Sequence, residues 1–595
     1  MDSDSSIGPE LKWRDLFCLL AVALLPLFSY PLSWLPSAWT QFRYTIALPL
    51  AAVSFVVLLL AAAKGALAPP WTLLPRNFLW PCGLLTMSWL VSVSLSQHRD
   101  FSILVLPSTL GNLALFWAAS SFSVDQLRKL CWIWLLVAAV VAVNGLARLG
   151  TEHEFVSTIG NRNFLGVYLA AAIPLAVALG DRRAAGLGAV LVVALCFTKS
   201  RGAWLALGIV TLLWIVVVRP RGGSVRTRIS VAVASIGLVV LVGFLFRGYV
   251  QNQWRTDVRP VIWKGTLHMI GAHPILGCGL GTYWVQYAEF RLPEYFARPK
   301  AGNFTNHAHN ELLEVAAEQG VVGLATLLWL WAAAVTVGLR AAANTTGTGR
   351  CLRYGLIGAT LVFMFHAMVD VDLRSLPNQA LLWILLGLLA GGGGGKVAHL
   401  SFRSRPARLV VASVGTLVAA WVLYAAVIQP VRADYWEREA RLAEARGDLS
   451  TAARAARQSL EIQPLRVETR YFLAGVLAER PATYQQAIDE GLVVEGLAPN
   501  YSDLTYNIGE LYIKMHQPDE ALPFLQRAVR MNPYSAEKRF ALALAFAESS
   551  QPATAEEQLE TAIRLKPDLT EAVDLLQRLR RQQKRPQEEA RGGSQ

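Results

Sequence analysis

Cysteine is scarce in this chain, with six residues among 595, and no two of them form a CxxC pair. Cys18, Cys82, Cys131 and Cys196 lie in apolar runs, where cysteine acts as a small hydrophobic side chain. This usage supports neither a disulfide framework nor the paired spacing of a zinc site. We therefore predict no metal site and no cofactor.

Charged residues are also few. They make up 16% of the chain, hydrophobic residues make up 54%, the mean hydropathy is +0.38, and tryptophan occurs 19 times. These values are typical of a membrane protein, in which tryptophan anchors helices at the interface. Residues 1–10 lack the basic region and cleavage site of a removable signal peptide, so we expect the first apolar run to be retained as a membrane helix.

Long apolar runs predict an all-α bundle of about 12–13 membrane spans, because a span needs about 20 apolar residues. The thirteen runs cover residues 16–35, 44–63, 78–96, 103–121, 130–149, 164–180, 185–198, 202–218, 229–246, 311–339, 354–370, 379–395 and 409–429. With a cytoplasmic N-terminus, Lys and Arg number nineteen in the inner segments and six in the short outer loops. This bias predicts that the long loop, about 247–310, and the part after the last span lie outside.

The charge balance changes near residue 431. From Arg432 onward the chain carries 22 basic and 25 acidic residues, whereas the part before it carries 33 and 17. We therefore predict a membrane domain at 1–431 and a second domain at 432–595. The basic residues of the membrane part lie in short loops between apolar runs, so we predict no nucleic-acid partner and contacts with membrane lipids instead.

The second domain has an internal repeat. Pro464, Pro499, Pro533 and Pro567 are separated by 35, 34 and 34 residues. A 34-residue period that ends in proline resembles the tetratricopeptide repeat, a pair of helices that stacks into an α-solenoid. Such an array offers a binding surface for a protein partner, or it braces the membrane part.

A polar segment precedes one of the longest apolar runs. Residues 306–311 read Asn-His-Ala-His-Asn-Glu, and nine residues (311–319) separate Asn310 from Gly320-Val321-Val322-Gly323. Titratable groups at the edge of a bilayer are costly unless they line a cavity or serve chemistry. Histidine takes up and releases a proton near neutral pH, so His309 is a candidate general base, with His307 as its competitor.

Three further polar elements lie in the predicted outer loops. Residues 198–204 include Lys199 and Arg201, and residues 255–264 include Arg255 and Arg259 before Trp263. Residues 273–283 read His-Pro-Ile-Leu-Gly-Cys-Gly-Leu-Gly-Thr-Tyr and end at Tyr283. The three glycines follow no predicted strand, so we expect a tight turn packed on a helix and not a nucleotide loop. Gly160-Asn161-Arg162-Asn163-Phe164 precedes the sixth span.

The order of these elements resembles the O-antigen ligase and polymerase superfamily of membrane glycosyltransferases. The resemblance rests on Ser200-Arg201-Gly202, Arg259 four residues before Trp263, His273-Pro274 and His309-Asn310. It implies a polyprenyl-diphosphate-linked glycan donor, with Arg201 and Arg259 binding the diphosphate and His309 acting as base. The further substrate-binding residues that it suggests are Lys199, Arg255, Asn310, Tyr283, His307 and Asn163.

The acceptor is not defined by these motifs. Lipid, glycan and protein acceptors all fit, as does a polymerase that joins lipid-linked repeat units, or a transporter or scaffold for polysaccharide assembly. The resemblance implies a bacterial inner membrane, with the active site and the repeats outside. Asp370 and Asp372 are the nearest acidic pair, and we expect Arg374 to pair with them; for His366 we expect a helix-packing role.

Overall fold

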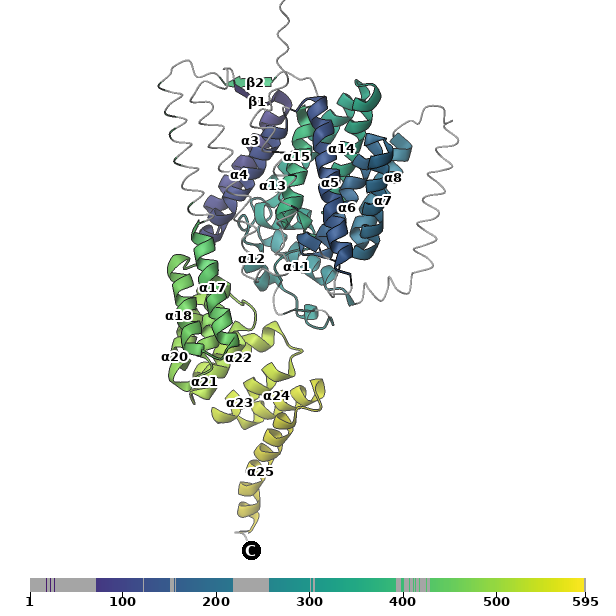
Figure 1. The fold of residues 1–595 in the computed structure, drawn as a ribbon. Helices are drawn as coiled ribbons and strands as arrows, with labels where there is room; N and C mark the ends of the chain where they lie inside the picture. Colours follow the sequence, from purple (N-terminus) through teal and green to yellow (C-terminus); the bar gives the residue numbers. More distant parts are fainter. Residues whose placement is uncertain are drawn as a thin grey trace, which may run out of the picture. The chain divides into compact units, whose positions relative to one another are not determined.

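The computed structural model describes residues 71–120, 122–149, 155, 157–217, 256–299, 301–302, 305–391, 397–400 and 428–592, and the isolated positions 18, 22, 26, 406, 410, 413, 417 and 424 (Figure 1). Two compact units make up the chain. The first comprises Met1–Arg247, Ala272–Thr282 and His307–Asp434, and the second comprises Gly248–Gly271, Tyr283–Asn306 and Tyr435–Gln595. The predicted spans at 16–35, 44–63, 229–246 and 409–429 lie wholly or largely outside the described residues.

The first unit is a bundle of apolar helices. They are α3 (Arg76–Leu95), α4 (Arg99–Ala119), α5 (Val124–Ala147), α6 (Arg162–Leu179), α7 (Arg182–Thr198), α8 (Arg201–Val217), α13 (Glu311–Ala343), α14 (Gly347–His366) and α15 (Leu376–Gly391). Among the described helices, those at Asn77–Leu95, Arg99–Ala119, Val124–Ala147, Arg162–Leu179 and Glu311–Ala343 are long and apolar enough to cross a membrane. The chain is therefore a multi-pass membrane protein, and the predicted all-α class is confirmed.

A short two-stranded ribbon is the one addition to that class among the described residues. Strand β1 (Trp71–Pro75) pairs antiparallel with β2 (Val397–Leu400), with Trp71 opposite Leu400 and Thr72 opposite His399. The apolar pattern of the neighbouring runs gave no signal for it, because the strands are too short to show a two-residue period.

Helix α6 is central to the first unit. It packs against α14, α7, α5 and α8, and every residue from Leu165 to Ala172 is buried. Helix α14 approaches it through glycines: a Cβ at Gly355 would lie 2.5 Å from the Cβ of Ala178, and one at Gly358 would lie 2.9 Å from the Cβ of Pro174. Small residues permit such close helix contacts in membranes. This packing fixes the start of α6 relative to the end of α14, where the polar motif residues lie.

The second unit contains the repeats and part of the loop that precedes α13. The loop part forms α11 (Arg259–Ala272), α12 (Tyr283–Phe290) and the short helix η2 (Pro293–Tyr295). The repeats comprise α17 (Gln429–Ala445), α18 (Leu449–Ile462), α19 (Val467–Leu477), α20 (Tyr484–Leu497), α21 (Leu504–Lys514), α22 (Pro518–Met531), α23 (Ala536–Glu548), α24 (Pro552–Leu565) and α25 (Thr570–Gly592).

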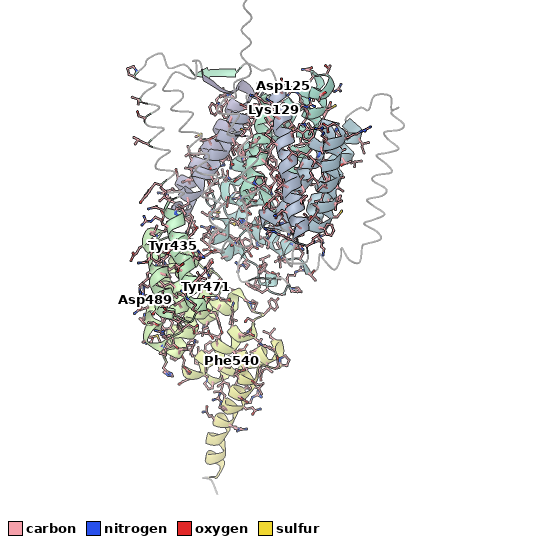
Figure 2. The ribbon with its side chains drawn as sticks, viewed as in Figure 1. Asp125, Lys129, Tyr435, Tyr471, Asp489 and Phe540 are labelled. Carbon is pink, nitrogen blue, oxygen red and sulfur yellow. The ribbon has the colours of Figure 1, made fainter. Side chains whose placement is uncertain are left out.

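The repeat prediction is confirmed by the helix pairs. Each periodic proline follows the second helix of a pair: Pro533, for example, lies two residues after α22. Within that pair, a Cβ at Gly509 would lie 2.6 Å from Leu525, so glycine lets the two helices approach closely. Tyr471 and Phe540, labelled in Figure 2, lie on the first helices of two different pairs.

Candidate functional site

The turn before α13 is held by its asparagine. Asn310 caps the helix, because its Oδ1 accepts a hydrogen bond from the amide of Leu313 at 3.0 Å. Its Nδ2 donates to the carbonyl of Met368 at 2.8 Å, and the amide of Glu311 donates to the carbonyl of Ala367 at 2.8 Å. Asn310 thus ties the motif turn to the segment that follows α14.

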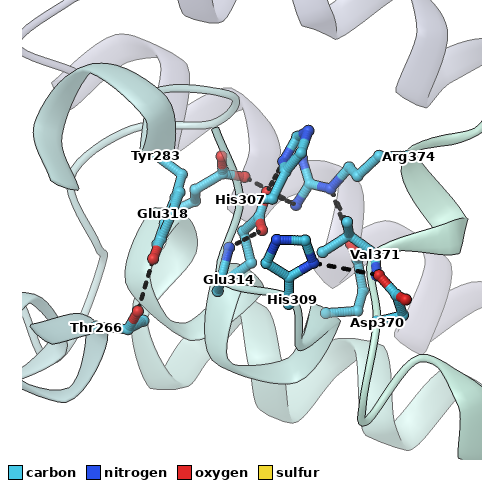
Figure 3. Close-up of polar contacts among 11 residues, drawn as sticks. Thr266, Tyr283, His307, His309, Glu314, Glu318, Asp370, Val371 and Arg374 are labelled. Atoms are coloured by element: carbon cyan, nitrogen blue, oxygen red, sulfur yellow. Dashed lines mark hydrogen bonds and ion pairs between the residues drawn. The ribbon is translucent and has the colours of Figure 1, made fainter. Parts of the chain in front are cut away.

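His309 occupies the tightest point of this turn, with a φ of 51°. Its Nδ1 lies 3.3 Å from Oδ1 of Asp370 (Figure 3). The Oδ2 of Asp370 accepts a hydrogen bond from Nδ2 of Asn163 at 2.6 Å. The Asp370 side chain is 6% exposed, whereas the His309 side chain is 37% exposed. A carboxylate at Nδ1 favours the tautomer with its proton there, which leaves the Nε2 lone pair free to accept one. The structure thus brings together His309 and Asn163, predicted separately, through an aspartate.

A second histidine faces a different carboxylate. Nδ1 of His307 lies 2.9 Å from Oε1 of Glu314, and the other oxygen of Glu314 accepts the amide of Ala308 at 2.8 Å (Figure 3). Burial opposes the charged imidazole, but the Glu314 carboxylate outweighs it and raises the pKa of His307. We therefore interpret His307 as the ion-pair partner of Glu314, whereas His309 forms a dyad with Asp370.

Arg374 does not pair with Asp370 and Asp372, so that expectation is wrong. Its guanidinium lies 3.2 Å from Glu311, 3.5 Å from Glu314 and 3.3 Å from Glu318. The three glutamates lie at positions i, i+3 and i+7, which share one face of a helix. Their buried charges require a cation, and the loop carrying Arg374 supplies it.

The glycine-rich loop packs on a break in α13. At Gly320 the helix has a non-helical backbone, with φ of 65° and ψ of −167°. The carbonyls freed there accept the amides of Cys278 and Gly279 at 3.0 Å each, and the amide of Val321 donates to the carbonyl of Pro274 at 2.9 Å. The expected tight turn packed on a helix is thus present, and it explains the spacing between the histidine motif and its glycine.

The Ser-Arg-Gly element begins α8. Lys199 ends α7 in a left-handed conformation with φ of 53°, and Arg201 is exposed at the first position of α8. A Cβ at Gly202 would lie 3.0 Å from the imidazole of His366. His366, in turn, places Nδ1 2.8 Å from Asp372, and both side chains are buried. The expected packing role of His366 agrees with this burial.

The remaining predicted residues belong to the second unit or lie outside the described residues. Arg255 is not described. Arg259 begins α11, and its amide donates to Oδ1 of Asp257 at 3.0 Å. The Tyr283 hydroxyl lies 2.7 Å from Oγ1 of Thr266, and the ring is buried. The positions of Arg259 and Tyr283 relative to His309 therefore remain predictions.

The described part of the chain holds no candidate metal site. No group of three or more His, Cys, Asp and Glu side chains there has the arrangement of a metal site.

Apolar helices, a histidine–aspartate dyad at the start of one of them, and a repeat array define a multi-pass membrane protein with tetratricopeptide-type repeats. Residues 186–328 match the O-antigen ligase family, and residues 506–570 match the tetratricopeptide repeat family. The resemblance drawn from the motifs is confirmed on both parts. The ligase match encloses Arg201, Arg259 and His309 but stops before Asp370.

Parts of the chain are similar to individual known proteins. The exopolysaccharide production protein ExoQ of Rhizobium meliloti (strain 1021) is 28% identical over 223 residues, which cover 32% of this chain and 49% of that protein. The chain thus spans about half the length of this curated relative. Among solved structures, MamA (residues 41 to the end) from Desulfovibrio magneticus RS-1 is 24% identical, with a TM-score of 0.25, and covers 26% of this chain and 86% of its own. The repeat protein YrrB is 23% identical, with a TM-score of 0.24, and covers 25% and 76%.

Proposed function

We propose that this chain assembles surface polysaccharide by transferring a glycan from a polyprenyl-diphosphate-linked donor to an acceptor hydroxyl or amide. The observation that carries the proposal is the His309–Asp370 dyad, with its carboxylate anchored by Asn163. It lies at the end of a membrane helix, within reach of a donor whose lipid tail stays in the bilayer. The similarity to the O-antigen ligase family supports the same reaction class.

His309 acts as the general base in this proposal. Its Nε2 takes the proton of the acceptor hydroxyl as the oxygen bonds to the anomeric carbon. The bond between that carbon and the diphosphate oxygen breaks, and polyprenyl diphosphate leaves with both electrons. Asp370 favours the tautomer with its proton on Nδ1 and stabilises the imidazolium that forms, as the aspartate of a serine-protease triad does.

Arginine is suited to the leaving group. A diphosphate carries charge that grows during transfer, and a guanidinium binds phosphate through two parallel hydrogen bonds. Arg201 is exposed at the N-terminus of α8, where the helix dipole also favours an anion. Arg259 is the proposed second arginine, with Lys199 and Arg255 as auxiliary cations. Preorganised charge of this kind contributes on the order of 10²–10³ in rate per donor group in oxyanion holes.

The acceptor is proposed to be another lipid-linked unit. The relative that matches this chain is described as an exopolysaccharide production protein, which favours chain growth over ligation to a lipid. The enzyme would act at the outer face of a bacterial inner membrane, and the repeats would recruit a protein of the assembly machinery.

A reconstituted assay tests the reaction. Purified protein in lipid nanodiscs receives a synthetic polyprenyl-diphosphate glycan, with a second lipid-linked unit, a lipid acceptor or a peptide acceptor in separate reactions. We expect polyprenyl diphosphate to be released only with the second lipid-linked unit, and Arg201→Lys to reduce the rate at least tenfold, since a point charge does not replace the fork. If no polyprenyl diphosphate is released with any of the three acceptors, the result contradicts the proposed glycosyltransferase activity.

A further inference from the structure

Helix α12 is joined to the repeats by aromatic side chains. Trp284 on α12 meets Tyr501 edge to face, with ring centroids 6.3 Å apart and planes at 84°. Tyr501 meets Tyr471 of α19 in the same manner at 5.4 Å, and the Tyr471 hydroxyl accepts a hydrogen bond from Nδ2 of Asn507 on α21 at 2.9 Å. The contact between Trp284 and Tyr501, called the joint below, therefore connects α12 to two successive repeats within the second unit.

The turn that presents Tyr501 is conformationally restrained. Its neighbours Asn500 and Ser502 both have left-handed backbones, with φ of 60° and 49°. Asparagine adopts this conformation at little cost, whereas serine adopts it less readily. The side chain of Tyr501 projects from this turn between α20 and α21, where it meets Tyr471 and Trp284.

An electrostatic attraction acts in addition to the aromatic contact. Arg291, the residue after α12, lies within electrostatic reach of Asp503, which also binds Nζ of Lys538 at 2.6 Å. The guanidinium of Arg291 stacks on the rings of Tyr295 and Phe296, at 5.6 and 5.7 Å from their centroids. The attraction between Arg291 and Asp503 acts between the segment after α12 and the start of α21.

Helix α12 also holds α11, which begins at Arg259. The Tyr283 hydroxyl contacts Oγ1 of Thr266 at 2.7 Å, and a Cβ at Gly265 would lie 2.7 Å from the carbonyl of Phe290. The two helices therefore lie in close backbone contact, and Arg259 is linked to the repeats through α12.

We propose that the repeat array positions Arg259 for donor binding through the Trp284–Tyr501 joint, so that Trp284 and Tyr501 are positioning residues of the transferase. This inference rests on the proposed function, which assigns Arg259 to the diphosphate. When a loop spends only part of its time in the conformation that binds, its apparent affinity for the ligand falls in proportion to the fraction of time spent in that conformation. Losing the joint should therefore raise the KM for the donor and leave kcat nearly unchanged.

The test uses Trp284→Ala, Tyr501→Ala, the double variant and the conservative Tyr501→Phe in the full-length protein. Tyr534→Ala is the matched control, because Tyr534 is an exposed ring of the repeats outside the joint. Hydrogen exchange of residues 259–272 is measured without substrate, and kinetics are measured with the synthetic donor. We expect both single variants and the double variant to raise donor KM by a similar factor of roughly 3–10, the range for one aromatic pair.

Hydrogen exchange in α11 should become faster in Trp284→Ala, Tyr501→Ala and the double variant, while α19 and α21 stay protected. Tyr501→Phe and Tyr534→Ala should behave like wild type. Unchanged exchange in α11, or additive losses in the double variant, overturns the inference even if the enzyme is active. Faster α11 exchange in a protein that transfers no glycan upholds the joint but refutes the proposed function. Loss of protection in α19 and α21 assigns the residues to repeat folding and also overturns the inference.

Discussion

In the proposed mechanism, Asp370 selects the nitrogen of His309 that accepts the proton. Its Oδ1 faces Nδ1 of the ring, and Asn163 and the amide of Val371 also donate hydrogen bonds to the carboxylate. These hydrogen bonds restrain the carboxylate beside the ring. It is therefore suited to hold one tautomer and to stabilise the imidazolium.

Replacing Asp370 by asparagine tests this role. The amide can donate to Nδ1 and stabilise the wrong tautomer, so we expect kcat to fall roughly 10²–10⁴-fold with donor binding retained. Asp181→Asn is the control, because Asp181 caps α7 and asparagine caps helices equally well. The measurement is steady-state release of polyprenyl diphosphate together with donor binding. Wild-type turnover in Asp370→Asn contradicts the dyad.

The His307–Glu314 contact makes stability depend on pH. Glu314 raises the pKa of His307 in the folded state. The contact therefore makes its full contribution to the stability of the fold at pH values below the pKa of histidine in the unfolded chain. This contribution is lost as the pH rises through the higher folded pKa. We expect His307→Gln to lower the melting temperature more at pH 5.5 than at pH 8.5. The exposed His268→Gln should show no such difference, and an equal effect of His307→Gln at both pH values refutes the contact.

Single residues were predictable where a motif carried them and not where a partner lay far along the chain. His309 and Asn163 stood out in polar strings, but their shared partner Asp370 lies 61 and 207 residues away. Only the packing of α6 on α14 brings these segments together. Arg374 was assigned to the nearest acids in sequence, whereas helical periodicity places three glutamates of α13 around it. The i, i+3, i+7 spacing was the signal that could have revealed this.

At the scale of elements, α13 consists of two helical segments separated by Gly320. The φ of 65° and ψ of −167° at Gly320 lie in a region that only glycine adopts readily. A Cβ there would overlap the carbonyl of Ile275. The break lets the glycine-rich loop hydrogen-bond to the helix, and it thereby sets the direction of the segment that carries the glutamates.

Gly320→Ala should destabilise the first unit. Backbone strain alone costs about 1–3 kcal/mol, and the overlap with the backbone of Ile275 adds to it. Gly186→Ala is the control, because Gly186 lies in α7 with open space around its Cα. Thermal unfolding in detergent should show a large loss for Gly320→Ala and no loss for Gly186→Ala. Equal stability of the two variants contradicts the break.

Element boundaries in the described bundle followed the apolar runs closely. The run at 185–198 was the shortest predicted span, yet α7 covers Arg182–Thr198 as one helix. The break at Gly320 was not predictable from the same pattern, because the apolar positions of α13 continue on both sides of the glycine. Hydrophobicity therefore indicated where the helices lie. The break in α13, in contrast, depends on hydrogen bonds to the glycine-rich loop, which lies far from Gly320 in the sequence.

At the scale of the whole molecule, the positive-inside bias predicts that the repeats lie on the outer side of the membrane. Lys514 is exposed on α21, and Arg182 is exposed at the start of α7 on the predicted cytoplasmic side. In a background without Cys196 and Cys351, Lys514→Cys should react with an impermeant maleimide in cells whose outer barrier alone is opened. Arg182→Cys should react only after the inner membrane is opened. The reverse pattern contradicts the predicted orientation.

The division into units was only partly visible in the sequence. The change in charge near residue 431 predicted where the repeats begin, but it carried no information on α11 and α12. Those helices precede α13 in the chain and yet group with the repeats, through Trp284 and Tyr501. A contact between single aromatic rings more than 200 residues apart leaves no local pattern.

The most direct test of the central claim is single-turnover transfer by His309→Ala, with His307→Ala beside it. We predict that His309→Ala binds the polyprenyl-diphosphate donor with wild-type affinity and releases no polyprenyl diphosphate, because the acceptor has no base. His307→Ala should keep measurable transfer, since His307 is held by Glu314. An active His309→Ala together with an inactive His307→Ala would contradict the account and assign the base to the other histidine.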